Sequence, residues 1–532
     1  MHLETVCALA LLSGRSLAQE LVPLLRSNEL VAGQAVTSIR SPVISSDRHW
    51  AALVNTFASG TATTKRLVVD GALALSVGDA LAAPPARVAS LVNVAGSIDN
   101  LVVLVGLDLM PPPLPPTGRA VLRNGQVVLL SGAPLVAAGL PVGTLCRNIY
   151  SCGANARDTV VALVDTADLQ YALVRLEFDE LGVNVARTVE LRTGQALPDG
   201  ALVSTFDSAQ QGGFAQAVSG DDWMWRVTAT DGRERLVTSA QVLLRSGDPS
   251  PVPGRSILSV HPANSFHHGH DLNDLGGHAA LVMLSGASTS NGLLLKNSVK
   301  LAQEGDVLAS LAPQALVDFA PCVRISNSGQ VYWVARTDGP LGNNIALMRD
   351  LEVVLRQGET DVQGQLLNSI DGNSWDITAD GRYLLARVGL LPLDRALLRI
   401  DLGAAVPILG CVPNPGTLRH TAGYVLTGNT IRLTLDGPAP QGALVHLQLS
   451  LGEATPADPC GIPTPFGELL IDPTRRLPLI RAGIFANGPV SVDLGIPADP
   501  ALVDLEIFGQ GAFVTPASFM RTNGMRLLIG AD

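Results

Sequence analysis

The sequence predicts an all-β protein, a seven-bladed β-propeller followed by a small antiparallel β-sandwich. Two observations support this. A short apolar phrase ending in glycine recurs at a nearly fixed interval, and a turn followed by an apolar strand recurs between its copies. A period of this length, built from strand-like runs, is typical of a radial β architecture. We therefore expect seven blades over about residues 20–408, with six or eight blades as the alternatives.

The first phrase is a run of mostly apolar, strand-like residues that ends in a Gly, often followed by Asp. Steps of 54, 62, 53, 58 and 53 residues separate its six glycines. The copies occupy 73–78, 127–132, 189–194, 242–247, 299–305 and 352–358.

The second phrase is a polar turn rich in Asn, Ser, Asp and Gly that leads into a Val-, Leu- and Ala-rich strand. These turn residues tolerate positive φ and bond to their own backbone, so they suit the entry to a hairpin. Together the two phrases give each repeat two hairpins, which is one four-stranded blade. The seven copies occupy 46–54, 97–105, 155–164, 219–227, 273–282, 327–335 and 378–386.

The seventh repeat lacks its last strand, because its second half stops after residues 395–401. Residues 24–33 resemble the second halves of other repeats and are the candidate for the missing strand. An N-terminal strand in the last blade would close the ring and remove its free sheet edges.

A domain boundary is expected at about residue 408, where the repeat rhythm stops. The expected domains are therefore a signal peptide at 1–18, the propeller at 19–408 and the C-terminal module at 409–532. Several C-terminal strands alternate apolar and polar residues, which is typical of a strand with one solvated face. Short antiparallel strands of this kind suggest a β-sandwich. The strand candidates are 430–435, 443–451, 467–471, 490–494, 502–508 and 525–529.

Charge and hydropathy exclude two classes of partner. The net charge of −11 is dispersed without a basic stripe, which argues against nucleic acid. The sequence has no run of eighteen apolar residues, so we expect no membrane span. Residues 6–12 form a short apolar stretch, and cleavage before Gln19 would remove it as an export signal. The alternative is that this stretch is the first, partly buried segment of the propeller. We therefore expect an extracytoplasmic protein, secreted or at the cell surface.

Cysteine spacing is consistent with an oxidising compartment. Cys146 and Cys152 are candidates for one disulfide, and Cys411 and Cys460 for another. Cys322 is left over if Cys7 is removed with the signal. The alternative for each pair is two buried thiols that pack as small apolar residues.

The phrases Asn327-Ser-Gly-Gln-Val331 and Asn273-Asp-Leu-Gly276 resemble those of exported tandem-repeat surface proteins, in which an Asn-x-x-Gly-x-x-Ala-Phe phrase recurs. Such proteins occur in planctomycete- and myxobacteria-like bacteria. The tail is similar to a C-terminal module carried by many of them, through residues 410–417, 460–463, 499–503 and 522–527. This chain has Ala or Trp where Phe is usual. The resemblance implies export and an architecture, and it supplies no catalytic residues.

The histidine-rich segment is the main candidate for metal chemistry. His267, His268, His270 and Asp271 could bind a transition metal such as zinc, because imidazole and carboxylate are zinc ligands. The alternative is a solvated polar loop. Calcium is a second hypothesis, at the Gly-Asp pairs 78–79, 247–248 and 305–306, which otherwise serve as turns.

No nucleophile elbow, zincin or phosphate-loop motif occurs in the sequence. The acids of 219–223 are either a glycosidase-like pair or a hairpin cap. Trp223 and Trp225 either stack on a sugar or pack between blades. The sequence therefore favours a non-catalytic binding or structural protein whose partner is a polysaccharide or a cell-surface protein. The alternative is an extracellular polysaccharide hydrolase or lyase with acids in the propeller channel.

Overall fold

The structure is a computed structural model that describes residues 21–531, apart from 58–62, 82–84, 110–117, 169, 207–216, 221, 261–268, 393, 455–459 and 487. It is an all-β fold, as the sequence predicted. Short 3₁₀ turns, η2 (Ser288–Ser290) and η3 (Pro500–Leu502), interrupt the strands. No helix in the described part is long and apolar enough to cross a membrane.

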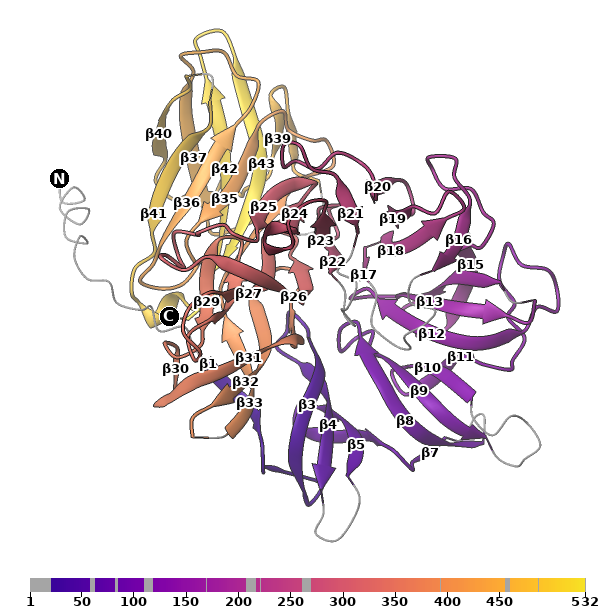
Figure 1. Ribbon diagram of the computed structural model, residues 1–532. Coiled ribbons are helices and arrows are strands. Elements are labelled where there is room, and N and C mark those ends of the chain that lie inside the picture. Colours follow the sequence, from indigo (N-terminus) through magenta and orange to yellow (C-terminus); the bar gives the residue numbers. More distant parts are fainter. Residues whose placement is uncertain are drawn as a thin grey trace.

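In the described residues up to Asp401, the strands form seven antiparallel sheets, numbered 1 to 7 in chain order. Figure 1 shows them arranged radially, in a propeller-like ring. Sheet 1 contains β2 (Leu30–Val31), β3 (Gln34–Ile44), β4 (Trp50–Phe57), β5 (Thr64–Val69) and β6 (Ala72–Ser76). Sheet 2 contains β7 (Ala80–Leu81), β8 (Ala86–Ala95), β9 (Val102–Leu109), β10 (Gly118–Arg123) and β11 (Gln126–Leu130). Sheet 3 contains β12 (Cys146–Ala154), β13 (Thr159–Thr166), β14 (Tyr171–Phe178) and β15 (Asn184–Arg192).

The remaining sheets of the ring repeat this pattern. Sheet 4 contains β16 (Val203–Phe206), β17 (Ala217–Ser219), β18 (Asp222–Ala229), β19 (Glu234–Thr238) and β20 (Val242–Arg245). Sheet 5 contains β21 (Ile257–Ser259), β22 (His270–Leu272), β23 (His278–Leu284), β24 (Gly292–Lys296) and β25 (Val299–Gln303). Sheet 6 contains β26 (Leu316–Ile325), β27 (Val331–Thr337), β28 (Ile345–Arg349) and β29 (Glu352–Arg356). Sheet 7 contains β30 (Asp361–Val362), β31 (Gln365–Ile377), β32 (Tyr383–Leu390), β33 (Asp394–Asp401) and β1 (Leu21–Arg26).

Apolar side chains between neighbouring sheets form the core of the ring. Each cluster of buried residues takes members from two consecutive sheets. A further cluster joins the two ends, where Val36 and Trp50 of sheet 1 pack with Tyr383 and Leu385 of sheet 7. Because both faces of most sheets are covered, their strands are runs of Val, Leu and Ala rather than alternating patterns.

The N-terminal strand β1 is the outer strand of sheet 7. It pairs antiparallel with β33, and Leu21 lies opposite Ile400. The prediction that an N-terminal strand completes the last sheet is confirmed, but only residues 24–26 of the predicted segment 24–33 belong to that strand, and Leu30–Val31 lie in sheet 1.

The repeated glycines mark the crossovers between sheets. All six adopt φ between 76° and 98°, a region that side chains with a Cβ disfavour. Each donates its N–H to a carbonyl at the start of the next sheet, as Gly305 does to Leu316 at 2.7 Å. Each crossover needs the same backbone conformation and the same hydrogen bond, which explains why glycine recurs at this point of the repeat. The other five are Gly78, Gly132, Gly194, Gly247 and Gly358.

The chain passes from the ring to the C-terminal strands between Asp401 and Ala404. A five-stranded sheet, sheet 8, has the order β34 (Ala404–Ile408), β43 (Phe519–Leu528), β42 (Glu506–Val514), β37 (Leu444–Ser450) and β40 (Ile480–Ile484). Sheet 9 has the order β35 (Thr417–Ala422), β36 (Thr430–Asp436) and β41 (Val490–Gly495), and a separate hairpin joins β38 (Ile462–Thr464) to β39 (Gly467–Leu469).

Sheets 8 and 9 share one apolar core, in which Ile431 and Leu433 of sheet 9 meet Val445 and Leu527 of sheet 8. Most predicted C-terminal strands are present. The segment predicted at 502–508 differs, because η3 ends at Leu502 and β42 begins only at Glu506.

The C-terminal sheets are docked on the ring (Figure 1). Tyr424 and Leu426 belong to the core cluster that lies between sheets 6 and 7. Arg349 of β28 donates to the Gly423 carbonyl at 2.8 Å, and its guanidinium lies 3.6 Å from the centre of the Tyr424 ring.

Candidate functional site

The histidine-rich segment is only partly covered by the structure, because His267 and His268 lie outside the described residues. His270 and Asp271 are consecutive in β22. Successive side chains of a strand point to opposite faces, so these two do not converge on one ion. Among the described residues, no group of three His, Cys, Asp or Glu could hold a metal. The zinc site stays a prediction that depends on His267 and His268.

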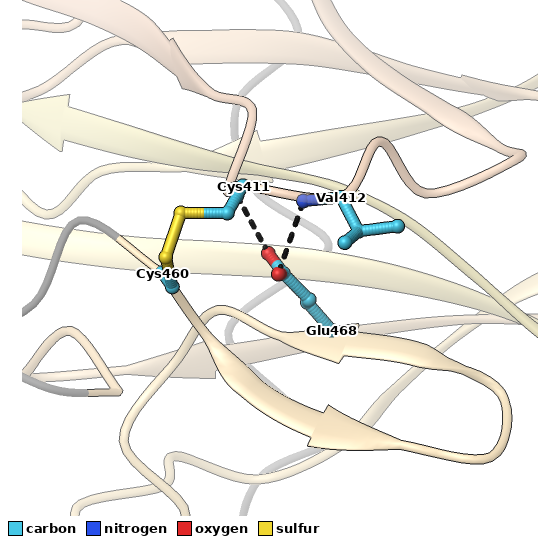
Figure 2. Close-up of a disulfide and its surroundings, with 4 residues drawn as sticks. All are labelled: Cys411, Val412, Cys460 and Glu468. Carbon is cyan, nitrogen blue, oxygen red and sulfur yellow. Dashed lines mark hydrogen bonds between the residues drawn. A yellow bond between two sulfur atoms is a disulfide. The ribbon is translucent and has the colours of Figure 1, made fainter.

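The C-terminal cysteine pair is bonded as predicted. Figure 2 shows the disulfide between Cys411 and Cys460, which are 49 residues apart in sequence. Beside it, the buried Glu468 carboxylate accepts the N–H groups of Cys411 at 2.9 Å and Val412 at 3.1 Å. The disulfide and the carboxylate together fix the start of the C-terminal sheets to the β38–β39 hairpin.

The predicted disulfide between Cys146 and Cys152 is wrong. Both cysteines are buried and lie in the single strand β12, outside any disulfide. Six residues of extended chain separate Cα atoms by roughly 20 Å, whereas a disulfide needs less than about 7 Å. The alternative, buried thiols that pack as apolar residues, describes both. Burial raises the pKa of each thiol to about 12, so neither is a reactive thiolate.

The residues facing the centre of the ring form the best candidate for a ligand site. A cavity of about 190 Å³ is lined by residues from all seven sheets, mainly on the inner strands, and we call it the channel mouth. The inner strands are β3, β8, β12, β17, β22, β26 and β31.

Three consecutive sheets place charged side chains at the channel mouth. Asp271, Arg324 and Asp376 each stand two residues before the first turn residue of their sheet. Sheets 1 and 3 have Val43 and Gly153 at the matching position. One side of the mouth is therefore charged and another side is lined by small or apolar residues.

Hydrogen bonds tie these charged groups to neighbouring strands. Arg324 Nε donates to Asp376 Oδ1 at 3.1 Å. Asp376 Oδ2 accepts the N–H of Ile44 at 3.3 Å, and Asp271 Oδ2 accepts the N–H of Ile325 at 2.8 Å. Each carboxylate therefore links its own inner strand to the inner strand of the next sheet.

Burial sets the acidity of the two carboxyl groups. It raises the pKa of Asp271 to about 6, with a contribution from the negative charge of Asp376 that Arg324 opposes. Burial also raises the pKa of Asp376, again against the influence of Arg324. The Arg324 and Asp376 side chains keep 22% and 14% of their surface exposed, so both remain accessible from the channel.

The asparagines of the repeated turn join neighbouring sheets. Asn100 Nδ2 donates to the Asn155 carbonyl at 3.1 Å, and Asn155 Nδ2 donates to the Gly220 carbonyl at 2.9 Å. Asn273 Nδ2 donates to the Ser326 carbonyl at 2.7 Å. The sequence showed these residues as turn formers, and their bonds between sheets became visible only in the structure.

In the described part of the chain, Trp223, Trp225 and Asp222 have structural roles. Trp223 and Trp225 are buried in the core between sheets 3 and 4, which confirms the packing interpretation. Asp222 accepts the N–H groups of Trp223 and Ser239 and caps its hairpin, while Asp221 lies outside the described residues.

The Gly-Asp pairs shape turns. Asp79 accepts the N–H of Ser76 at 2.7 Å, and Asp306 accepts the N–H of Gln303 at 2.9 Å. In the third pair, Asp248 bonds to Arg245.

Comparison with known proteins gives no family. No protein-family model matches the chain, and no curated protein matches it. Among solved structures, the WD40 domain of SCAP from fission yeast is 7% identical, with 96% of this chain and 98% of that chain covered and a TM-score of 0.26. A GH43 glycoside hydrolase, engineered to display both endo-xylanase and exo-arabinofuranosidase activity, is 10% identical, with 96% of each chain covered and a TM-score of 0.17. Because both TM-scores are below 0.5, the description of the fold rests on strand pairing and not on these matches.

Proposed function

We propose that the chain is an exported, non-catalytic binding or structural protein of the bacterial cell surface, of the tandem-repeat type described above. In this proposal the seven sheets are the blades of a β-propeller, residues 19–408, that recognises a ligand at the channel mouth. Residues 409–532 are a β-sandwich that docks the protein to the cell surface or to another protein.

The main support for a non-catalytic role is that the carboxylates at the channel mouth are already hydrogen-bonded to other parts of the ring. Asp271 and Asp376 each accept a main-chain N–H from the neighbouring inner strand, and Asp376 is also bonded to Arg324. A glycosidase needs two carboxyl groups placed across the scissile bond and free to exchange protons with it. Carboxylates that join strands are better suited to holding the ring and presenting a fixed charge.

The size of the channel mouth favours a small epitope. Its volume of about 190 Å³ is below the ~300–1,000 Å³ of sites that enclose a whole organic ligand. Such a site holds one unit of a larger partner, such as the terminal sugar of a polysaccharide or one side chain of a cell-surface protein. Arg324 and Asp271 would supply a donor and an acceptor, and Val43 an apolar wall.

One observation favours the alternative, an extracellular polysaccharide hydrolase or lyase. A carboxyl group with a pKa of about 6, as at Asp271, is suited to donate a proton near neutral pH.

The deciding experiment exposes the protein, residues 19–532, to a panel of bacterial and plant polysaccharides and follows binding and reducing-end release together. We expect binding without release, and we expect Arg324→Gln to weaken it. Asp318→Asn serves as the matched control, because Asp318 is an exposed acid elsewhere on the ring. Release of reducing ends that Asp271→Asn abolishes would establish the enzyme instead. If neither binding nor release is observed, glycans are excluded as ligands, and a protein becomes the expected partner.

A further inference from the structure

An arginine and phenylalanine patch lies on the C-terminal sheets, away from the channel mouth. Phe466, in the turn of the β38–β39 hairpin, is 51% exposed, and its ring centre lies 5.5 Å from that of Phe519 at the start of β43. The Arg521 guanidinium lies 5.0 Å from the centre of the Phe519 ring. With Arg476, these residues define what we call the Phe466 patch.

Within the described part of the chain, no ion pair compensates the positive charge of the Phe466 patch. Among the described residues, neither Arg521 nor Arg476 has an ion-pair partner, and the buried Arg521 Nε has no hydrogen-bond acceptor. Burial lowers the pKa of Arg521, and the like charge of Arg476 lowers it further. By contrast, the exposed Arg432 on the same sheets forms two bonds to Asp493, at 2.7 and 2.9 Å.

The two neighbouring arginines form a local excess of positive charge on a chain whose net charge is −11. A half-buried guanidinium has lost part of its hydration, so an incoming carboxylate gains more from it than from a fully solvated cation. Exposed aromatic residues and arginines, without lysines or acids, are also the composition found at the centre of protein interfaces.

We propose that the Phe466 patch binds an acidic protein segment in which a carboxylate lies beside an apolar side chain. The proposal rests on the proposed function and deepens it, since it names the docking surface of the C-terminal sheets and the chemistry of its partner. A protein fits better than a polysaccharide because the two rings are inclined at 60° and do not present one flat face for a sugar to stack on.

The test pans a random peptide library against the protein without its expected signal peptide, residues 19–532, with depletion on a Phe466→Ala/Arg521→Gln variant. We expect enrichment of peptides that combine Asp or Glu with a large apolar residue. Titration of an enriched peptide should show binding that salt weakens and that Phe466→Ala or Arg476→Gln each reduces by roughly tenfold. Arg419→Gln and Ile484→Ala are the matched controls, because both residues are exposed elsewhere on these sheets.

The result that overturns the proposal is the absence of enriched acidic peptides, or enriched peptides that bind the patch variants and the parent protein equally. Binding of polygalacturonate that depends on Phe466 and Arg476 would also overturn it, in favour of a glycan surface. Arg324→Gln should leave peptide binding unchanged, so failure of the patch and failure of the channel site are separate results.

Discussion

Two seams of the ring are held in different ways. Between sheets 5 and 6, the buried Asn273 accepts the N–H groups of Leu275 and Gly277 at 3.1 and 2.7 Å and donates to the Ser326 carbonyl. This amide is uncharged and belongs to the repeat itself, although the Lys296–Asp350 ion pair and the bond from the Ile325 N–H to Asp271 also cross the seam.

The closing seam, between sheets 7 and 1, is charged. Arg48 of sheet 1 donates to the Tyr383 hydroxyl at 2.7 Å and pairs with Asp504 at 2.6 Å. Asp504 belongs to the C-terminal part and also bonds to Arg382 of sheet 7, which pairs with Asp401 at 3.2 Å. The seam between sheets 5 and 6 is therefore held by groups of the ring itself, whereas closure also uses an acid from outside the ring.

The largest effect should come from removing the C-terminal sheets. We expect residues 21–402 to fold alone but to be less stable than the ring in the full chain. Truncation uncovers the core that Leu426 and Tyr424 fill, which are 0% and 9% exposed, and removes Asp504. Burial of two such side chains is worth about 4 kcal/mol. Urea unfolding of both proteins measures the difference, and equal midpoints would contradict the role of the C-terminal part in closure.

Asn273→Ala should cost about 2–3 kcal/mol, because it leaves the Ser326 carbonyl and two turn N–H groups unsatisfied in a buried place. Since the bonds are between uncharged groups, the loss should not vary with salt. Asn273→Asp, which keeps the acceptor, is the comparison variant. A loss that disappears in high salt would show that ionic contacts, and not the Asn273 bonds, account for it.

Asp504→Asn should cost about 1 kcal/mol, since the Asp504 carboxylate is 52% exposed and partly screened. Its bonds to Arg382 and then Arg48 hold the pKa of Asp504 below its ordinary value. This stabilisation is therefore present above pH ~4 and is lost as pH falls through the folded-state pKa. The gap in free energy of unfolding between parent and variant should close in acid and in high salt. If the difference in free energy of unfolding stays constant with pH and salt, the Asp504 bonds do not stabilise the protein as ion pairs.

Asp271→Asn should give the smallest effect, with the opposite dependence on pH. The folded-state pKa of Asp271 is about 6, above its ordinary value, so its ionisation destabilises the fold as pH rises through that value. Asn keeps an acceptor for the Ile325 N–H without the charge. Relative to the parent, the variant should gain about 1 kcal/mol between pH 4 and pH 7 after screening by channel water. Thermal unfolding of the parent and the variant between pH 4 and pH 7 checks this gain. The prediction is wrong if the two stabilities change in parallel with pH.

The ring could be predicted from the sequence because every repeat has the same backbone requirement at its crossover. The six glycines could be found because each crossover requires positive φ and permits little besides glycine. The N-terminal strand could be found because the seventh repeat was visibly incomplete. The disulfide between Cys146 and Cys152 failed because a short spacing was taken for a loop, whereas both residues lie in one extended strand.

The charged side of the channel mouth was harder to predict. Arg324 follows Asp271 by 53 residues and precedes Asp376 by 52, which matches the repeat. The three residues alternate in sign, however, and other sheets have Val43 or Gly153 at the position, so no single residue type recurs there in every sheet. The bonds from the carboxylates to Ile325 and Ile44 depend on which strands are neighbours in space.

The pairing of β1 with β33 has a consequence for biosynthesis. About 370 residues separate Arg26 from Asp394, and at about 5–20 residues per second their synthesis takes roughly 20–75 s. Throughout that time β1 lacks its native partner β33, and sheet 7 later emerges with an open edge. Where several chains are made close together, β1 of one copy can complete sheet 7 of another, so the same pairing that closes a monomer also provides the route to a strand-exchanged dimer.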